Sequence, residues 1–454
     1  MIQNERESWQ SKIGFIAAAS GSAIGLGNIW RFPYLVGENG GAAFIILYLI
    51  CIGIVGLPVM LAELSIGRAA GKNPFGAFRL LAPGTPWKHL GSLGIVTGFG
   101  ILSFYSVVAG WTLGYLVQGI NGRFTGPSAV ENTSELFSSL VASPVFAVGL
   151  MSIFIMITGL VVLKGVQSGI ERWSKLLMPI LLVILLMLVV RSLTLPGAMT
   201  GLEFYLKPRF DQVTAGTLVD ALGQALFSLS IGMGTMITYG SYLSKKDNMV
   251  SSSLWICVMD TTIAITAGLA IFPALFALGM EPNAGPPLVF IVFPSVLGLM
   301  PGGYWFGIGF FGLLAMAALT STISLMEVVV AFTVEEFGWS RRRSVLYISL
   351  LCAALAIPSA LSFGSVEFFS SLPGLGIPFL DLMSIVFGDF ALAIGAFMIA
   401  IFAGRIWGIT PALEELVLGN ERFRGKGAWK FMILFVTPLA ILTILINLVR
   451  TTFL

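Results

Sequence analysis

Long apolar segments separated by short polar or Gly/Pro-rich joints make up most of the chain. Since a helix needs about 20 apolar residues to cross a bilayer, the pattern predicts an all-α polytopic membrane protein with about eleven transmembrane helices. They are expected near residues 13–36, 41–68, 90–120, 143–163, 167–191, 216–242, 250–279, 304–334, 343–360, 376–403 and 430–450. The polar joint 121–143 is expected on an aqueous face, and the proline-rich region 281–301 is expected to form a surface hairpin of short helices.

Two of the apolar segments carry the same interruption. The stretch 22–28 (SAIGLGN) and the stretch 229–235 (LSIGMGT) align so that one isoleucine and two glycines coincide. A glycine costs about 0.8–1.0 kcal/mol relative to alanine in a helix, so each stretch is predicted to break its helix near the membrane midplane. Paired breaks at corresponding positions of two halves indicate a transporter's binding site. Close helix packing would also explain one glycine pair, but it explains two matching pairs less well.

Composition supports a membrane protein, and the placement of positive charge orients it. Hydrophobic residues make up 57% of the chain and charged residues 10%, against about 25% charged residues in soluble proteins. Nineteen of the 25 Lys and Arg residues fall at joints on one side of the membrane, five fall on the other side, and Arg31 lies within a segment. Because Lys and Arg favour the cytoplasmic side, the N-terminus is expected in the cytoplasm and the C-terminus outside the cell.

This topology relates the two interrupted helices by symmetry. The first begins inside and the sixth begins outside, so residues 13–191 and 216–403 are candidates for two inverted repeats of five helices. Residues 1–12 are expected to form a cytoplasmic N-terminal gate segment, and residues 430–450 are expected to form an additional eleventh helix.

Three groups of polar side chains lie in otherwise apolar segments. Ser22 and Asn28 flank the first break, Ser228 and Ser230 flank the second, and residues 320–324 (TSTIS) lie in the eighth segment. A single Ser or Thr in a membrane helix often only bonds the carbonyl one turn earlier. Three groups together favour an oxygen-lined site for a hard cation.

Charged residues within predicted helices are functional candidates by default, and Arg31 and Asp260 are of this kind. The only histidine, His89, lies in a linker, so no Ser–His pair can form inside the membrane. With no nucleotide-binding motif either, the chain is not expected to be an enzyme or to bind nucleic acid; its surroundings are membrane lipid. Three functions remain as alternatives: a transporter, a sensor that binds its substrate without moving it, and an ion channel.

Several of these stretches resemble a known family. The run 23–33 (AIGLGNIWRFP), followed by ENGG at 38–41, is closely similar to the neurotransmitter:sodium symporters, as are GWTLG at 110–114, GIER at 169–172 and the second break. The resemblance extends over nearly the whole chain and is strongest to bacterial amino-acid transporters. It implies the leucine-transporter fold, with helices 1 and 6 broken at the midplane, and sodium-driven uptake of hydrophobic L-amino acids by alternating access.

Family roles transfer to the matching positions. The resemblance implies substrate contacts at Ala23, Gly25, Gly27, Ile101, Tyr105, Phe227, Ser228, Ser230, Met233, Ser321 and Leu325. It implies one sodium site at Ala23, Asn28, Ser228 and Asp260, completed by the carboxylate of the substrate, and a second sodium site at Gly21, Ile24, Ala317, Thr320 and Ser321. It implies an outer gate at Arg31 and Asp381, and an inner gate at Arg6, Trp9, Tyr242 and Glu335.

Three positions depart from the family pattern. Asp260 stands where many members have asparagine, so it either ligates sodium or supplies the negative charge that chloride supplies in animal relatives, and no chloride requirement is expected. Ser384 stands where the outer-gate acid is expected, so Asp381, about one helical turn earlier, is the expected partner of Arg31. Met233 replaces a common phenylalanine and favours a broad range of substrate sizes, because methionine adapts its shape. No oligomeric state follows from these features.

Overall fold

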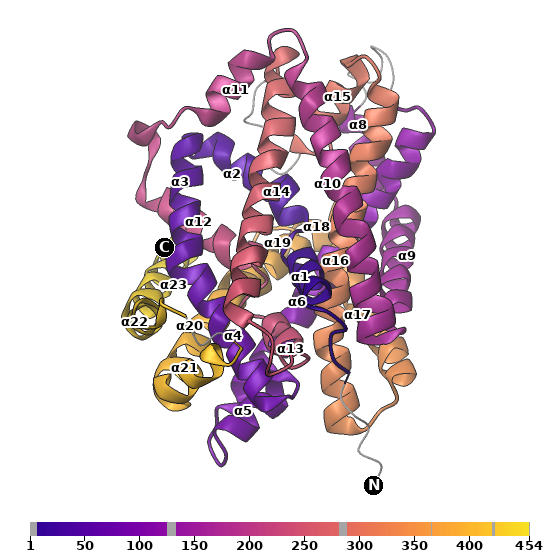
Figure 1. Ribbon diagram of the computed structural model, residues 1–454. Coiled ribbons are helices and arrows are strands. Elements are labelled where there is room, and N and C mark those ends of the chain that lie inside the picture. Colours follow the sequence, from indigo (N-terminus) through magenta and orange to yellow (C-terminus); the bar gives the residue numbers. More distant parts are fainter. Residues whose placement is uncertain (1–6, 125–132, 281–287, 365, 420–422, 454) are drawn as a thin grey trace.

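The computed structural model describes residues 7–124, 133–280, 288–364, 366–419 and 423–453. These residues form a bundle of helices that run between two faces of the molecule (Figure 1). We call the face at which α1 (Lys12–Ala23) begins the N-terminal face. The bundle confirms the all-α class that the apolar pattern predicted.

Within the described residues, nine helices are long and apolar enough to cross a membrane. They are Ala42–Ala70 (α3, Ala42–Cys51, with α4, Leu57–Ala70), Lys88–Ile120 (α6), Pro144–Val162 (α9), Val166–Leu193 (with α10, Arg172–Leu193), Met249–Ala277 (α14), Gly303–Phe337 (α16), Arg341–Ala360 (α17), Phe379–Ile406 (with α19, Phe379–Met383, and α20, Leu392–Ile401) and Lys426–Arg450 (with α22, Lys426–Phe431, and most of α23, Thr437–Phe453). Each coincides with a predicted apolar segment.

The two interrupted segments are built differently from these nine. The first consists of α1 and the stretch Gly27–Glu38, which ends in α2 (Phe32–Glu38), and the two parts are bent by 53°. The second consists of α12 (Ala215–Ser228) and α13 (Thr235–Gly240), separated by residues 229–234. Because α12 and α13 are each short, the count of about eleven crossings stays a prediction. The division into two inverted repeats also stays a prediction.

Shorter helices cover the two ends of the bundle. The helices α8 (Thr133–Ala142), α11 (Ala198–Leu206) and α15 (Val292–Leu299) lie at the top of Figure 1, opposite the N-terminal face. The helices α5 (Pro74–Leu81) and α21 (Ile409–Val417) lie toward the bottom. The helix α15 is short, as predicted, but most of its residues are buried, and residues 281–287 lie outside the described residues, so the surface hairpin stays a prediction. The helix α8 within the joint 121–143 was not predicted.

The helices α6 and α16 form the centre of the bundle. In each, 83% of the most apolar stretch is buried inside the protein, whereas only 28% is buried in the last spanning helix. Glycines let neighbours come close to α6: a Cβ on Gly110 would lie 2.7 Å from the backbone nitrogen of Met151 in α9. The outer helices expose their apolar residues instead, as expected of helices that face lipid.

The second break has a backbone that suits glycine. Gly232 and Gly234 have φ values of 88° and 79°, in a region that costs a residue with a side chain roughly 1–2 kcal/mol. Among the described residues other than glycine, Ser230 alone has a positive φ, of 53°. Strained backbone of this kind concentrates at ligand sites. The glycines that suggested a helix break therefore also set its shape.

Gly232→Ala should lower the thermal unfolding temperature of the detergent-solubilised protein. The new Cβ would overlap the carbonyl oxygen of Leu392 in α20, in addition to the strain of roughly 1–2 kcal/mol from the positive φ. Gly149→Ala in α9 is the matched control, because open space surrounds the position of its missing Cβ. The prediction is wrong if the two variants unfold at the same temperature.

Candidate functional site

A small cavity lies where the two breaks meet α6 and α16. Its volume is about 20 Å³, little more than the roughly 10–15 Å³ that one water molecule needs. The lining residues are Ser22, Ala23, Gly25, Gly27, Ile101, Tyr105, Phe227, Ser228, Ser230, Met233, Ser321 and Leu325. The structure thus brings together every residue that the resemblance implied as a substrate contact, and it adds Ser22.

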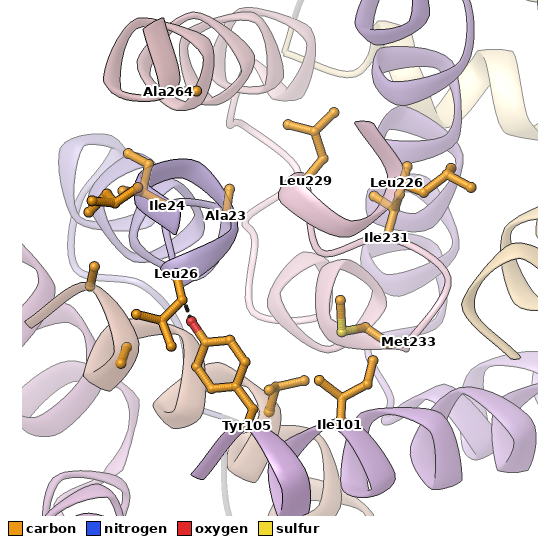
Figure 2. Close-up of a cluster of buried hydrophobic side chains, with 14 of the residues drawn as sticks. Ala23, Ile24, Leu26, Ile101, Tyr105, Leu226, Leu229, Ile231, Met233 and Ala264 are labelled. Carbon is orange, nitrogen blue, oxygen red and sulfur yellow. Dashed lines mark hydrogen bonds between the residues drawn. The ribbon is translucent and has the colours of Figure 1, made fainter. Parts of the chain in front are cut away.

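The bare backbone at Gly25 is a steric requirement of this cavity. The Tyr105 hydroxyl accepts a hydrogen bond from the backbone nitrogen of Leu26 at 2.8 Å (Figure 2). A Cβ on Gly25 would lie 2.7 Å from that hydroxyl and 2.7 Å from Oγ of Ser321. Glycine allows the backbone to approach a ligand closely, so the cavity presents amide groups and hydroxyls at its centre.

Ser22 ties the first break to the second break and to α16. Its carbonyl accepts hydrogen bonds from Oγ of Ser230 at 2.9 Å and from Oγ of Ser321 at 3.1 Å. Its own hydroxyl donates to Oγ of Ser324 at 2.7 Å. A carbonyl freed from helical bonding therefore has two partners from other elements, as a buried polar group requires.

Three of the residues implied for the first sodium site form one buried cluster. The Asn28 amide donates to a carboxylate oxygen of Asp260 at 2.7 Å. The Ser228 hydroxyl lies 2.8 and 2.9 Å from the two carboxylate oxygens. Asp260 is fully buried, and these partners are neutral. Ala23, the fourth implied residue, lies nearby on the cavity wall. Oxygen atoms beside a buried carboxylate suit a hard cation.

Two polar residues of this region were missed by the sequence analysis. The Tyr48 hydroxyl donates to Asp260 at 3.0 Å, and the Gln224 amide donates to the carbonyl of Gly27 at 3.0 Å. Both side chains are fully buried. Each is a polar residue within a predicted apolar segment, which is the signal that could have identified it.

The residues implied for the second sodium site also lie together. A Cβ on Gly21 would come within 3.2 Å of the Thr320 side chain, so α1 and α16 are in direct contact there. Thr320 donates to the carbonyl of Ala317 at 2.9 Å. This is the local bond that Ser and Thr often form in membrane helices without any ligand. Ser321 reaches both Ala317 and α1. Ile24, fully buried, directly follows the last residue of α1 and caps the helix.

A carboxylate from α4 holds the second break in place. The backbone nitrogen of Gly232 donates to Glu63 at 2.6 Å, and Glu63 is fully buried. Glu63 thereby replaces a helical acceptor that the break removes. Glu63 lies within the predicted segment 41–68, so the criterion that singled out Arg31 and Asp260 should have included it.

The expected outer-gate pair of Arg31 and Asp381 is wrong. Arg31 lies 3.6 Å from the carboxylate of Asp389 instead. The cause is local helix geometry, because Ser384–Ala391 is a π-helix, in which hydrogen bonds join residues five apart. Asp389 is five residues after Ser384, the family's position for this acid, and therefore lies on the same face of the helix.

A larger cavity lies beyond the small one, on the side away from the N-terminal face. Its volume is about 430 Å³, and its walls are largely aromatic. It shares Gly27, Tyr105 and Phe227 with the small cavity, and Asp381 and Asp389 both line it. The Arg31 guanidinium lies 5.5 Å from the centre of the Phe227 ring. Phe227 therefore separates the two cavities, with the Arg31–Asp389 pair beside it.

Two of the residues expected at the inner gate, Trp9 and Tyr242, lie side by side. The Trp9 indole donates to the carbonyl of Tyr239 at 3.1 Å, and the Trp9 and Tyr242 rings are 6.0 Å apart. The Tyr242 hydroxyl donates to Glu327, a buried carboxylate that also pairs with Arg341 and that the sequence analysis missed. Glu335 accepts a hydrogen bond from the amide of Asn73 at 3.0 Å, and Arg6 lies outside the described residues.

A cavity beside two interrupted helices, in a bundle whose helices are long and apolar enough to cross a membrane, is typical of secondary transporters. The model of the sodium:neurotransmitter symporter family matches residues 6–130 and 131–452. An uncharacterized sodium-dependent transporter of Bacillus subtilis is 39% identical over 453 residues, covering 99% of each chain. A second, from Haemophilus influenzae, is 35% identical over 453 residues, covering 98% of each chain. The chain therefore belongs to the sodium:neurotransmitter symporter family, whose members are transporters and not enzymes.

A solved structure agrees with this assignment. The crystal structure of MhsT in complex with L-phenylalanine matches with a TM-score of 0.89 at 43% identity, covering 98% of this chain and 100% of that chain. This match confirms the expected leucine-transporter fold. The protein is a sodium-coupled transporter that crosses the membrane several times.

Asp389→Asn should slow transport without lowering the unfolding temperature. The Arg31–Asp389 pair is about one-third exposed, and such pairs stabilise a fold by only about 0–1 kcal/mol. The same energy can change the populations of open and closed states several-fold. Asp381→Asn, which changes an acid of the same cavity, is the matched control and should leave the transport rate unchanged. Equal slowing by both substitutions would contradict the assignment of Asp389.

Proposed function

We propose that the protein is a symporter that carries hydrophobic L-amino acids into the cell together with sodium, by alternating access. The observation that carries this proposal is the small cavity, in which backbone amides of the first break, apolar side chains and the Asp260 cluster meet. In this proposal the N-terminal face is cytoplasmic, as the distribution of Lys and Arg favours.

The carboxylate of the substrate would bind at the first break. Gly25 leaves its backbone open beside the Tyr105 hydroxyl, and a hydroxyl and amide groups are suitable donors to a carboxylate. That carboxylate would also complete the coordination of sodium at Asn28, Ser228 and Asp260, because hard cations prefer oxygen ligands. A substrate without a carboxylate would leave both sets of groups without a partner.

The side chain of the substrate would bind among apolar residues. Ile101, Phe227, Met233 and Leu325 supply apolar walls to the cavity, and a methionine can adjust to side chains of different sizes. MhsT, with 43% identity to this chain, has been crystallised with L-phenylalanine. The small volume of the cavity means that its walls must move apart to admit such a substrate.

Two sodium ions would supply the driving force. Each positive charge that moves inward across 100 mV contributes about 2.3 kcal/mol. Two ions would therefore contribute about 4.6 kcal/mol, roughly a thousandfold accumulation of substrate. The proposed second ion would bind at Gly21, Ile24, Ala317, Thr320 and Ser321, where α1 and α16 meet.

Two alternatives share this fold. An ion channel needs a continuous pore, whereas the volume of this cavity is only about 20 Å³. A sensor would bind the same amino acid without moving it. Transport into sealed vesicles separates a sensor from a carrier.

Purified protein in proteoliposomes should accumulate radiolabelled L-phenylalanine only when sodium is higher outside than inside. Other hydrophobic L-amino acids should compete, whereas phenethylamine, the decarboxylated analogue of L-phenylalanine, should not, because it lacks the carboxylate. Liposomes without protein and liposomes with equal sodium on both sides are the controls. Competition by phenethylamine as strong as that by L-leucine would rule out the proposed role of the first break.

Uptake should also proceed without chloride. Asp260 supplies a negative charge next to Asn28 and Ser228, and such a charge offsets that of a bound cation. Replacing chloride by gluconate should leave the uptake rate of the parent protein unchanged. Asp260→Asn should abolish uptake or make it respond to chloride, whereas Asp211→Asn, at an exposed acid, should behave as the parent. A chloride requirement in the parent protein would contradict this role of Asp260.

A further inference from the structure

The carboxylate of Glu171 binds the segment that leads into α1. Glu171 belongs to the run 169–172 (GIER), and its side chain is 1% exposed. It accepts hydrogen bonds from the backbone nitrogen of Gln10 at 2.8 Å and from the Ser11 hydroxyl at 3.1 Å. Lys175, four residues later, lies 2.5 Å away. Two of the three donors therefore come from the opposite segment.

The N-terminal turn of α1 is shaped to admit this carboxylate. A Cβ on Gly14 would overlap the carboxylate of Glu171, so only glycine leaves the space that the carboxylate occupies. The Ser11 hydroxyl caps α1 by accepting from the backbone nitrogen of Gly14, and it donates to Glu171. The start of α1 and the buried carboxylate thus depend on each other.

The same segment is held on its other side by Trp9, which donates to the carbonyl of Tyr239 beyond the second break. Further hydrogen bonds join Glu7 to Val166, Ser8 and Gln10 to Gln167, and Lys12 to Ser251. The helix α1 is bent by 53° from the part that follows it. Figure 1 shows it near the middle of the bundle with the chain running down from it to the N-terminal face. The helices α1 and α13 lie between the small cavity and the N-terminal face. The cavity can therefore open toward this face only if α1 or α13 moves.

We infer that Glu171 is a positioning residue that keeps α1 closed against the helix containing α10, and so sets how often the cavity opens toward the N-terminal face. Swinging α1 outward removes the Gln10 and Ser11 donors from Glu171 and leaves it only Lys175, which lies on its own helix. A buried carboxylate that loses hydrogen bonds is unfavourable, so the contact favours the closed state. This inference rests on the proposed alternating-access mechanism, but its test does not require transport.

The test measures how fast a buried thiol reacts with a charged, membrane-impermeant thiol reagent. Ser20→Cys is a suitable reporter, because Ser20 is fully buried in α1 and its hydroxyl lies 3.6 Å from the Met259 sulfur in α14. The parent chain, whose cysteines at 51, 257 and 352 are buried, provides the blank. In purified protein without sodium or substrate, Glu171→Gln should raise the labelling rate of the reporter about tenfold. Hydrogen bonds to a charged group stabilise the closed state enough that their loss changes the open population by about this factor.

Three controls distinguish positioning from general destabilisation. Glu203→Gln makes the same chemical change in another Glu–Lys pair four residues apart, Glu203–Lys207, which is exposed, and it should leave labelling unchanged. A second reporter, Ser192→Cys, is buried at the far end of α10 and should stay protected in the Glu171→Gln protein. Gly14→Ala, which displaces the carboxylate while keeping its charge, should raise labelling of the Ser20→Cys reporter as Glu171→Gln does.

The possible outcomes separate the inference from the proposed function. Faster labelling at the first reporter alone supports the role of Glu171, even if the protein proves inactive in uptake. Unchanged labelling in both Glu171→Gln and Gly14→Ala overturns it, even if sodium-driven uptake is found. Equal acceleration at both reporters also overturns it, because the carboxylate would then only stabilise the fold. If Glu171→Gln fails to fold, labelling of the two reporters is compared in the Gly14→Ala protein instead.

Discussion

The buried carboxylate of Asp260 is the group on which the centre of the structure depends. Its hydrogen-bond partners Asn28, Tyr48 and Ser228 are neutral and come from three other parts of the bundle. A buried ionised carboxylate is unfavourable unless a positive charge compensates it. A bound cation beside both helix breaks would provide that compensation, which gives a physical reason for the sodium dependence of the family to which the chain belongs.

The other polar groups of the site follow from the same need to satisfy buried atoms. Each break frees backbone groups in the interior, and these groups find partners across the site: Ser230 and Ser321 donate to the Ser22 carbonyl, and Glu63 accepts from Gly232. The two broken helices and the helices around them are therefore joined by hydrogen bonds at the small cavity. In the proposed alternating-access mechanism, a movement of α1 would break these bonds together with those that Gln10 and Ser11 donate to Glu171.

The helices and their breaks could be predicted because that information is local in the sequence, whereas the residues expected at the site came from the family resemblance. Apolar segment length identified the spanning helices, and the glycine pairs at 25–27 and 232–234 identified the breaks. The partner of Arg31 could not be predicted by counting α-helical turns, because Ser384–Ala391 is a π-helix and the acid that pairs with Arg31 is Asp389, five residues after Ser384. Glu63 and Glu327 could have been identified as charged residues within apolar segments, but they were missed. Their partners could not be predicted, because these contacts join distant segments and no local pattern encodes them.

The central claim is that sodium and the amino acid bind next to each other at the two breaks and depend on each other. The most direct test is equilibrium binding of radiolabelled L-phenylalanine to detergent-solubilised protein over a range of sodium concentrations, with potassium keeping the ionic strength constant. The account predicts little binding without sodium and an affinity that rises steeply as sodium is added, because the carboxylate of the substrate completes the coordination of the ion at Asn28, Ser228 and Asp260. An affinity for L-phenylalanine that stays the same with and without sodium would contradict it.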